Sequence, residues 1–205
     1  MDDSVSALDL RQVERRDRLA AWERTMAGRL VPMGVDLSAD SDDDPHGMCR
    51  SLDLSDIRVT QWDCPELKLV RTKRMVETTD IEALILLTAS AGSQFFELDS
   101  GTACMESGSA LISTTRVAYS STVSSGLRKR SVVIPFAALA PYDTGGAVPD
   151  CLMLDQSRPL TRLLISFVDS MGTHITSMDS AEVDAARDAL LTLVAGVIRS
   201  NTCAA

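Results

Sequence analysis

The residue types that carry most metal and acid–base chemistry are scarce in this chain. Its 205 residues contain two histidines, His46 and His174. A transition-metal centre inside a β-barrel needs several imidazole nitrogens and a carboxylate as ligands. His46 follows an acidic stretch and His174 lies between two predicted helices, so neither falls on a predicted strand. The sequence therefore predicts no metal and no cofactor.

Nucleophilic and phosphate chemistry also lack their usual motifs. Serine is abundant, but no Gly-x-Ser-x-Gly elbow occurs, and two histidines leave few candidates for a general base. Gly145-Gly146 is not followed by Lys-Ser or Lys-Thr, so no phosphate-binding loop is indicated. Carboxylates such as Asp53 and Asp56 are expected to be surface or capping residues. We expect a binding protein and not an enzyme.

The cysteines predict a reducing compartment. Five are spread along the chain without a close pair: Cys49, Cys64, Cys104, Cys151 and Cys203. An odd, scattered set is not typical of a disulfide framework or a zinc knuckle. Reduced thiols in a cytoplasmic protein are the simplest interpretation, with a redox-sensing cysteine as the functional alternative. The acidic N-terminus is not a secretory signal, and no apolar stretch is long enough to span a membrane, so no membrane partner is expected.

The overall charge opposes nucleic-acid binding by these residues alone. The formal net charge is −9 and the isoelectric point is near 4.7, whereas surfaces that bind DNA neutralise phosphates with Lys and Arg. The basic clusters Arg15-Arg16 and Arg128-Lys129-Arg130 are expected to be solvated faces.

The pattern of the chain predicts three kinds of element in succession. A helix is expected from about Leu8 to Leu30, followed by a mobile loop over the aspartate-rich segment Asp36–Pro45, where calcium binding is the functional alternative. Short alternating runs then predict strands. These are Glu66–Val70, Ile81–Thr88, Gln94–Leu98, Thr102–Glu106, Ala110–Thr114 and Ser131–Ile134, with a tight turn at Asp99-Ser100-Gly101. Strands of this length and spacing fit a β-sandwich or barrel.

Two amphipathic helices are predicted between 157 and 200. In the first, Pro159 marks the start and Gly172 the end, and Asp179 with Glu182 has the spacing of a capping box before the second. The second has a coiled-coil spacing of apolar residues, which predicts an intersubunit contact. The residues expected in a homodimer interface are Leu164, Val183, Leu190, Leu193 and Val197. The alternative is that the helices pack on each other and on the barrel of the same chain.

The barrel is expected to enclose one small ligand. Because Phe95 and Phe96 are adjacent on a strand, only one can face inward. The residues expected to line the pocket are Trp62, Arg71, Phe96, Met105 and Tyr119, with the arginine pairing with an anionic group of the ligand. The alternative is that the aromatic residues are plain core and the basic residues face water.

Several segments, taken in order, resemble the effector-binding domain of AraC/XylS-type transcriptional regulators. They are Ala21-Trp22-Glu23, Val31-Pro32-Met33-Gly34-Val35, Val70-Arg71-Thr72-Lys73-Arg74, Thr102–Tyr119 and Ile134-Pro135-Phe136-Ala137-Ala138-Leu139. The resemblance covers roughly Leu8 to Arg199. Ser107-Gly108-Ser109 replaces the Pro-Gly-Asp turn of the family, and Phe136 replaces its Arg.

The resemblance implies an α+β fold with an N-terminal helix, a cupin-like antiparallel jelly-roll β-barrel and a C-terminal two-helix hairpin. The expected boundaries are an arm and helix at 1–35, the acidic loop at 36–56, the effector-binding barrel at 57–145 and a helical dimerisation region at 157–200. It also implies a DNA-binding helix-turn-helix domain, which is not among these residues. We therefore expect an effector-binding and dimerisation domain that contacts DNA only through such a further domain. The alternatives are an interaction domain with a solidly packed barrel, and a metal-free cupin-type isomerase or lyase.

Overall fold

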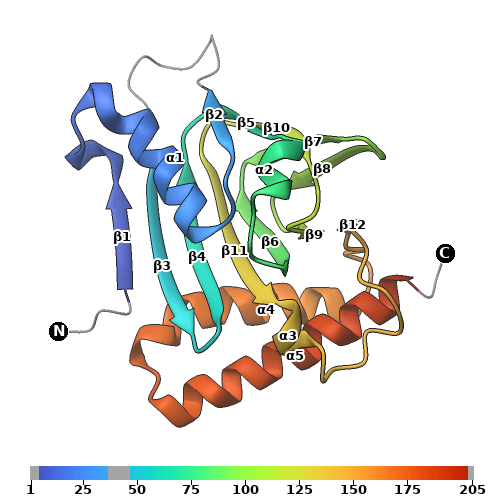
Figure 1. The fold of residues 1–205 in the computed structure, drawn as a ribbon. Helices are drawn as coiled ribbons and strands as arrows, with labels where there is room; N and C mark the ends of the chain where they lie inside the picture. The colour runs from blue at the N-terminus through green and yellow to red at the C-terminus, as the bar shows by residue number, and fades with distance from the viewer. Residues whose placement is uncertain (1–4, 37–46, 203–205) are drawn as a thin grey trace.

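The computed structural model describes residues 5–36 and 47–202, which form two antiparallel sheets with a helical hairpin beneath them (Figure 1). This arrangement confirms the predicted α+β order of a strand-built body followed by two helices. Most of the acidic segment, and with it the calcium alternative, lies outside the described residues. Asp36 is described and ends a strand.

The larger sheet has seven strands. In spatial order they are β1 (Val5–Asp9), β3 (Met48–Leu54), β4 (Ile57–Cys64), β11 (Leu127–Pro135), β6 (Ala83–Ala91), β9 (Ala110–Thr114) and β12 (Cys151–Met153). All neighbours are antiparallel. Because β1 and β3 precede residue 57 and β12 follows residue 145, the sheet begins earlier and ends later than the predicted barrel.

The smaller sheet has five strands and faces the larger one. Its order is β2 (Gly34–Asp36), β5 (Leu67–Arg71), β10 (Tyr119–Val123), β7 (Ser93–Leu98) and β8 (Gly101–Glu106). Leu98 pairs with Gly101, which leaves Asp99-Ser100 as the two-residue turn of a hairpin. The predicted hairpin is confirmed, and Gly101 supplies the positive φ of 134° that the turn requires.

Strand β6 explains why the run from Ile81 to Thr88 is apolar without alternation. Leu84 and Leu86 belong to the cluster shared with the C-terminal helices, whereas Ile85 and Leu87 belong to the cluster between the sheets. All four side chains are buried. The prediction of a central strand covered on both faces is confirmed.

The N-terminal segment differs from the single helix predicted over Leu8–Leu30. Helix α1 covers only Arg18–Arg29, and before it lie β1 and two 3-10 turns at Leu10–Gln12 and Arg15–Asp17. The Asp9 carboxylate accepts a hydrogen bond from the Arg11 backbone N–H at 3.0 Å. Short acidic side chains compete with helical hydrogen bonds in this way, and the pairing of β1 with β3 then favours a strand.

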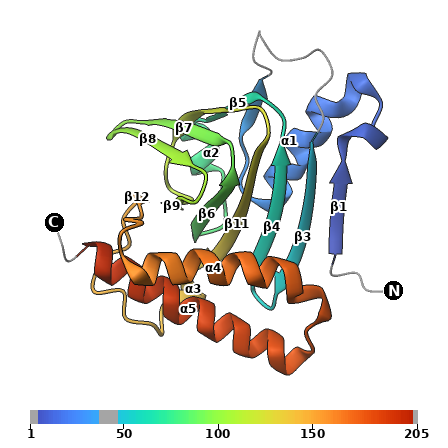
Figure 2. The same ribbon diagram turned by 180° about the vertical axis from the view of Figure 1, so that it is seen from behind.

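Helices α4 (Pro159–His174) and α5 (Ser180–Thr202) run side by side across the foot of the larger sheet (Figure 2). Their apolar faces pack against the outward side chains of that sheet. The predicted capping box is confirmed, because the Asp179 N–H donates to Glu182 Oε2 at 2.8 Å and the Glu182 N–H donates to Asp179 Oδ1 at 2.9 Å. Three shorter helical segments complete the described chain: α2 (Lys73–Glu77), α3 (Phe136–Leu139) and a 3-10 turn at Ile175–Ser177.

Two ion pairs tie the hairpin to the sheet. The Arg130 guanidinium on β11 pairs with Asp169 on α4. Arg187 on α5 donates to both carboxylate oxygens of Asp56, at 2.6 and 3.0 Å, and this holds the pKa of that carboxyl below its usual range. Gly172 lies inside α4 and is not the left-handed cap that the sequence predicts. A Cβ there would come within 2.5 Å of Arg130 Nε, so the glycine makes room for the arginine.

The helices use most of their apolar seam within the chain itself. Leu164, Leu190 and Val197 are fully buried in the cluster against the sheet. Val183 and Leu193 are only partly buried. The first three residues are therefore not exposed to a second copy, which corresponds to the alternative of packing within one chain.

Candidate functional site

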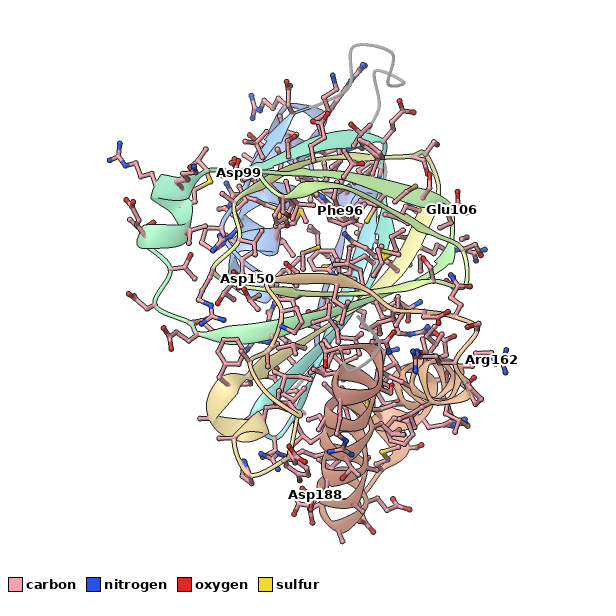
Figure 3. All side chains as sticks on the ribbon, turned by 90° about the vertical axis from the view of Figure 1, so that its right-hand side faces the viewer. Phe96, Asp99, Glu106, Asp150, Arg162 and Asp188 are labelled. Atoms are coloured by element: carbon pink, nitrogen blue, oxygen red, sulfur yellow. The ribbon has the colours of Figure 1, made fainter. Side chains whose placement is uncertain are left out.

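The space between the two sheets collects most of the residues predicted to line a pocket. Trp62, Phe96, Met105 and Tyr119 all belong to the apolar cluster there. Phe96 is buried, whereas its neighbour Phe95 is 41% exposed, so one of the pair faces inward as predicted. Figure 3 shows Phe96 between the sheets.

A small internal cavity brings two of these residues together. Phe96 on β7 and Tyr119 on β10 both line it, with ring centroids 5.7 Å apart in an edge-to-face arrangement. Burial raises the pKa of Tyr119 to about 12, so the phenol stays protonated at neutral pH. The cavity measures about 20 Å³, which is room for roughly one water molecule.

Trp62 and Met105 are core residues that do not reach this cavity. The Trp62 indole N–H donates to Ser131 Oγ at 2.8 Å, and its ring meets Trp22 of α1 edge to face at 5.6 Å. Met105 is fully buried on β8 opposite Gln94. Both residues hold α1 and the smaller sheet to the body.

Arg71 is buried but is committed to the protein itself. Its Nη1 donates to the Pro32 carbonyl at 2.6 Å, and its Nη2 donates to Thr79 Oγ1 at 2.9 Å and to the Thr115 carbonyl at 2.8 Å. Burial lowers the pKa of this guanidinium. Arg71 thus joins the entry to β2, the end of α2 and the exit of β9, and these contacts leave little of it for a ligand.

A second buried cation, Lys129, lies inside the barrel where the sequence predicted a solvated face. It is 2% exposed, and its Nζ donates to Gln94 Oε1 at 2.7 Å. Gln94 Nε2 in turn donates to Ser121 Oγ at 2.9 Å, which completes a polar link from the larger sheet to the smaller one. Burial lowers the pKa of the Lys129 ammonium. The missed signal is alternation, because Leu127, Lys129, Ser131 and Val133 share one face of β11.

An open cleft of about 440 Å³ lies at the mouth of the barrel. Its walls are α2, the β7–β8 turn, the segment after β9 and the start of β12, with Lys73, Glu77, Asp99, Arg116 and Asp150 as the charged residues. In Figure 3, Asp99 and Asp150 lie on either side of Phe96 in projection. Leu98 and Cys151 line both the cleft and the internal cavity, so the two spaces meet at these side chains. The size of the cleft is within the range of small-molecule sites.

Metal ligands are not gathered anywhere in the described part of the chain. Among residues 5–36 and 47–202, no three His, Cys, Asp or Glu side chains are close enough together to hold an ion. His174 ends α4 and is exposed, and His46 lies outside the described residues. The four described cysteines are free thiols, of which Cys49 and Cys64 are buried. In the same residues, no helix has the length and apolar character needed to cross a membrane.

Comparison with known proteins identifies the kind of domain that this barrel and hairpin form. The family model of the AraC-binding-like domain matches residues 22–199. The chain belongs to this family. The predicted resemblance to AraC-type effector-binding domains is therefore confirmed.

Solved structures agree with this assignment at the level of the fold. The crystal structure of the AraC-like transcriptional activator CuxR has a TM-score of 0.80 at 17% identity, over 95% of this chain and 70% of that chain. The EutQ protein of Clostridium difficile has a TM-score of 0.36 at 11% identity, over 46% of this chain and 71% of that chain. An RmlC-like cupin of Desulfovibrio desulfuricans has a TM-score of 0.31 at 11% identity, over 50% and 82%. No curated protein matches the chain.

Proposed function

We propose that this chain is the effector-sensing part of an AraC-type bacterial transcriptional regulator. A small molecule enters at the mouth cleft and contacts the polar groups between the sheets. The observation that carries this function is the continuity of the cleft with the interior at Leu98 and Cys151. Phe96 and Tyr119 line the inner part of this site, together with Lys129 and Gln94, whereas Trp62, Arg71 and Met105 support its walls.

Occupancy of the barrel would act by shifting a conformational equilibrium. A ligand favours whichever arrangement of the sheets and helices binds it better, and the helices of the hairpin pack directly on the outer face of the same sheet. DNA contact would be made by a helix-turn-helix domain outside these residues. A regulator of this kind works in the cytoplasm, where its DNA is.

A screen with two readouts tests effector binding. A compound present at 100 times its Kd adds about 2.7 kcal/mol of stability, which raises the Tm of a chain of this size by roughly 5–10 °C. The same compound should slow alkylation of Cys151, because that thiol stands where cleft and cavity meet. Cys104 is exposed on β8 and serves as the internal control whose alkylation rate should not change. A broad metabolite panel that produces neither effect would contradict the proposal.

The outer face of the hairpin is the surface that we propose for a homodimer. Leu163 on α4 is 59% exposed, and Leu160, Phe167 and Leu193 beside it are only partly buried. This replaces the buried Leu164, Leu190 and Val197 as the apolar surface available to a second copy. Large apolar side chains that remain exposed in a row are typical of protein–protein contacts.

Leu163→Asp is therefore expected to lower the mass measured by light scattering from that of a dimer to that of a monomer, with an unchanged circular dichroism spectrum. The reason is that an aspartate at the centre of an apolar contact must be desolvated there without a partner. Ala181→Asp adds the same charge at an exposed position at the start of α5 and should leave the mass unchanged. A dimer that persists in Leu163→Asp, or a wild-type monomer, would remove this surface from the proposal.

One observation favours a second function, an interaction domain that senses no small molecule. The cavity between the sheets holds only about 20 Å³, which is close to a solidly packed core. A domain of this kind would act through its surface alone. The Cys151 protection measurement separates the two functions, since an interaction domain offers no compound that reaches that thiol.

A further inference from the structure

The amine of Lys129 is the least satisfied buried group that faces the cavity. Lys129 lies on β11 between Trp62 of β4 and Ala89 of β6 in the register of the larger sheet. Its side chain points between the sheets and lines the cavity together with Gln94. A register shift occurs between Arg128 and Lys129 in the pairing with β6. Such bulges commonly re-aim side chains next to functional sites.

Only one of the three N–H groups of this ammonium has a partner in the described structure, namely Gln94 Oε1 at 2.7 Å. No carboxylate of residues 5–36 and 47–202 forms an ion pair with Lys129. Buried charges in proteins are normally paired or fully hydrogen-bonded because their desolvation is costly. Two donors of Lys129 therefore remain for another group.

Comparison with Arg71 shows that this is not a general feature of buried cations in the barrel. Arg71 donates three hydrogen bonds to fixed acceptors, two of them backbone carbonyls. Its role is complete without a ligand. Lys129 contacts one side-chain acceptor, and a neutral residue could form the same link to Gln94 without the cost of a buried charge. A positive charge at this position is useful where something negative binds.

The surroundings of Lys129 describe the rest of that ligand. The cavity walls near it are apolar, formed by Leu87, Leu111 and Phe96. One cation faces one cavity, so a single negative charge is balanced, whereas the two charges of a phosphate monoester would exceed it. The present volume of about 20 Å³ requires the cavity to widen toward the cleft.

We propose that the effector is a small organic monocarboxylate whose carboxylate accepts hydrogen bonds from Lys129 Nζ and whose apolar body packs on Leu87, Leu111 and Phe96. This inference rests on the proposed function, because it names the chemistry of the molecule that the same barrel would sense. Burial lowers the pKa of the amine in the empty protein, and an arriving carboxylate would favour its protonated form.

Matched ligands test the inference directly. Aliphatic and aromatic monocarboxylic acids are compared with their primary amides on the same carbon skeletons, by thermal shift and calorimetry at neutral pH. The wild-type protein is expected to bind at least one acid and to bind its amide about 10- to 100-fold more weakly, since a charge-assisted hydrogen bond is lost. Lys129→Met should bind the acid no better than the amide.

Two further variants keep the outcome interpretable. Lys68→Met makes the same substitution at an exposed position on β5 and should retain the preference for the acid. Lys129→Gln replaces the cation with a polar neutral group and gives the same comparison where Lys129→Met fails to fold. Equal binding of acid and amide by the wild type would overturn the inference and leave the proposed function standing. Failure of every small molecule to bind would overturn both.

Discussion

Leu190→Asp is expected to unfold the domain and not to release a folded monomer. Leu190 is fully buried where α5 packs on the larger sheet. The substitution removes a core leucine, which costs about 2–5 kcal/mol, and it also buries a carboxylate without a partner. A loss of this size approaches the whole stability of a typical domain, about 5–15 kcal/mol. Urea denaturation followed by circular dichroism measures it.

Ala189→Asp provides the matched control on the same helix. Ala189 is exposed one residue before Leu190, so its variant adds the same charge with a loss of about 1 kcal/mol or less from helix propensity. If Leu190→Asp instead gave a stable monomer with native helix content, Leu190 would lie at a contact between subunits and the packing of α5 on its own sheet would be refuted.

Arg71→Met is expected to lower the free energy of unfolding by about 2–4 kcal/mol. The Pro32 and Thr115 carbonyls would lose their donor, and each buried polar group without a partner costs about 1–3 kcal/mol. Relief of the desolvation that lowers the pKa of Arg71 offsets part of this loss. Because the three acceptors come from separate segments, the loss should be accompanied by faster hydrogen exchange around residues 32, 79 and 115.

Lys73→Met is the comparison for this prediction. Lys73 pairs with Asp99 at 3.0 Å, but both side chains are largely exposed, so its removal should cost less than about 1 kcal/mol. Arg71→Lys keeps the charge yet presents a single nitrogen in place of the planar fork, and it should recover little. An Arg71→Met variant as stable as the wild type would show that the guanidinium is available to a ligand after all.

The sequence predicts the fold well wherever local pattern and tertiary packing agree. The apolar run around Leu84–Leu87 becomes the central strand, the Asp99-Ser100 turn forms, and the Asp179–Glu182 capping box begins α5. The altered turn Ser107-Gly108-Ser109 also forms, with Gly108 at a φ of 82° and the Ser109 N–H bonded to the Glu106 carbonyl. Each of these features depends on a few neighbouring residues.

The candidate site is harder to predict because it depends on long-range contacts. Arg71 appears as a ligand partner in the sequence, yet carbonyls 39 and 44 residues away occupy its guanidinium. Lys129 appears as one of three solvated cations, yet its register opposite Trp62 turns it inward. The coiled-coil spacing of α5 likewise does not reveal whether a sheet or a second copy covers Leu190 and Val197. β10 and β12 escape detection because one is mostly small and polar and the other has three residues.

The position of Arg130 next to Lys129 has a mechanical consequence. One residue points between the sheets, and the following one points outward to the α4 carboxylate of Asp169. Consecutive Cα atoms are held about 3.8 Å apart by a rigid peptide unit. Any displacement of the main chain at the amine therefore moves the anchor of α4 with it. The route from the inside of the barrel to the outer helices is a single amide plane in length.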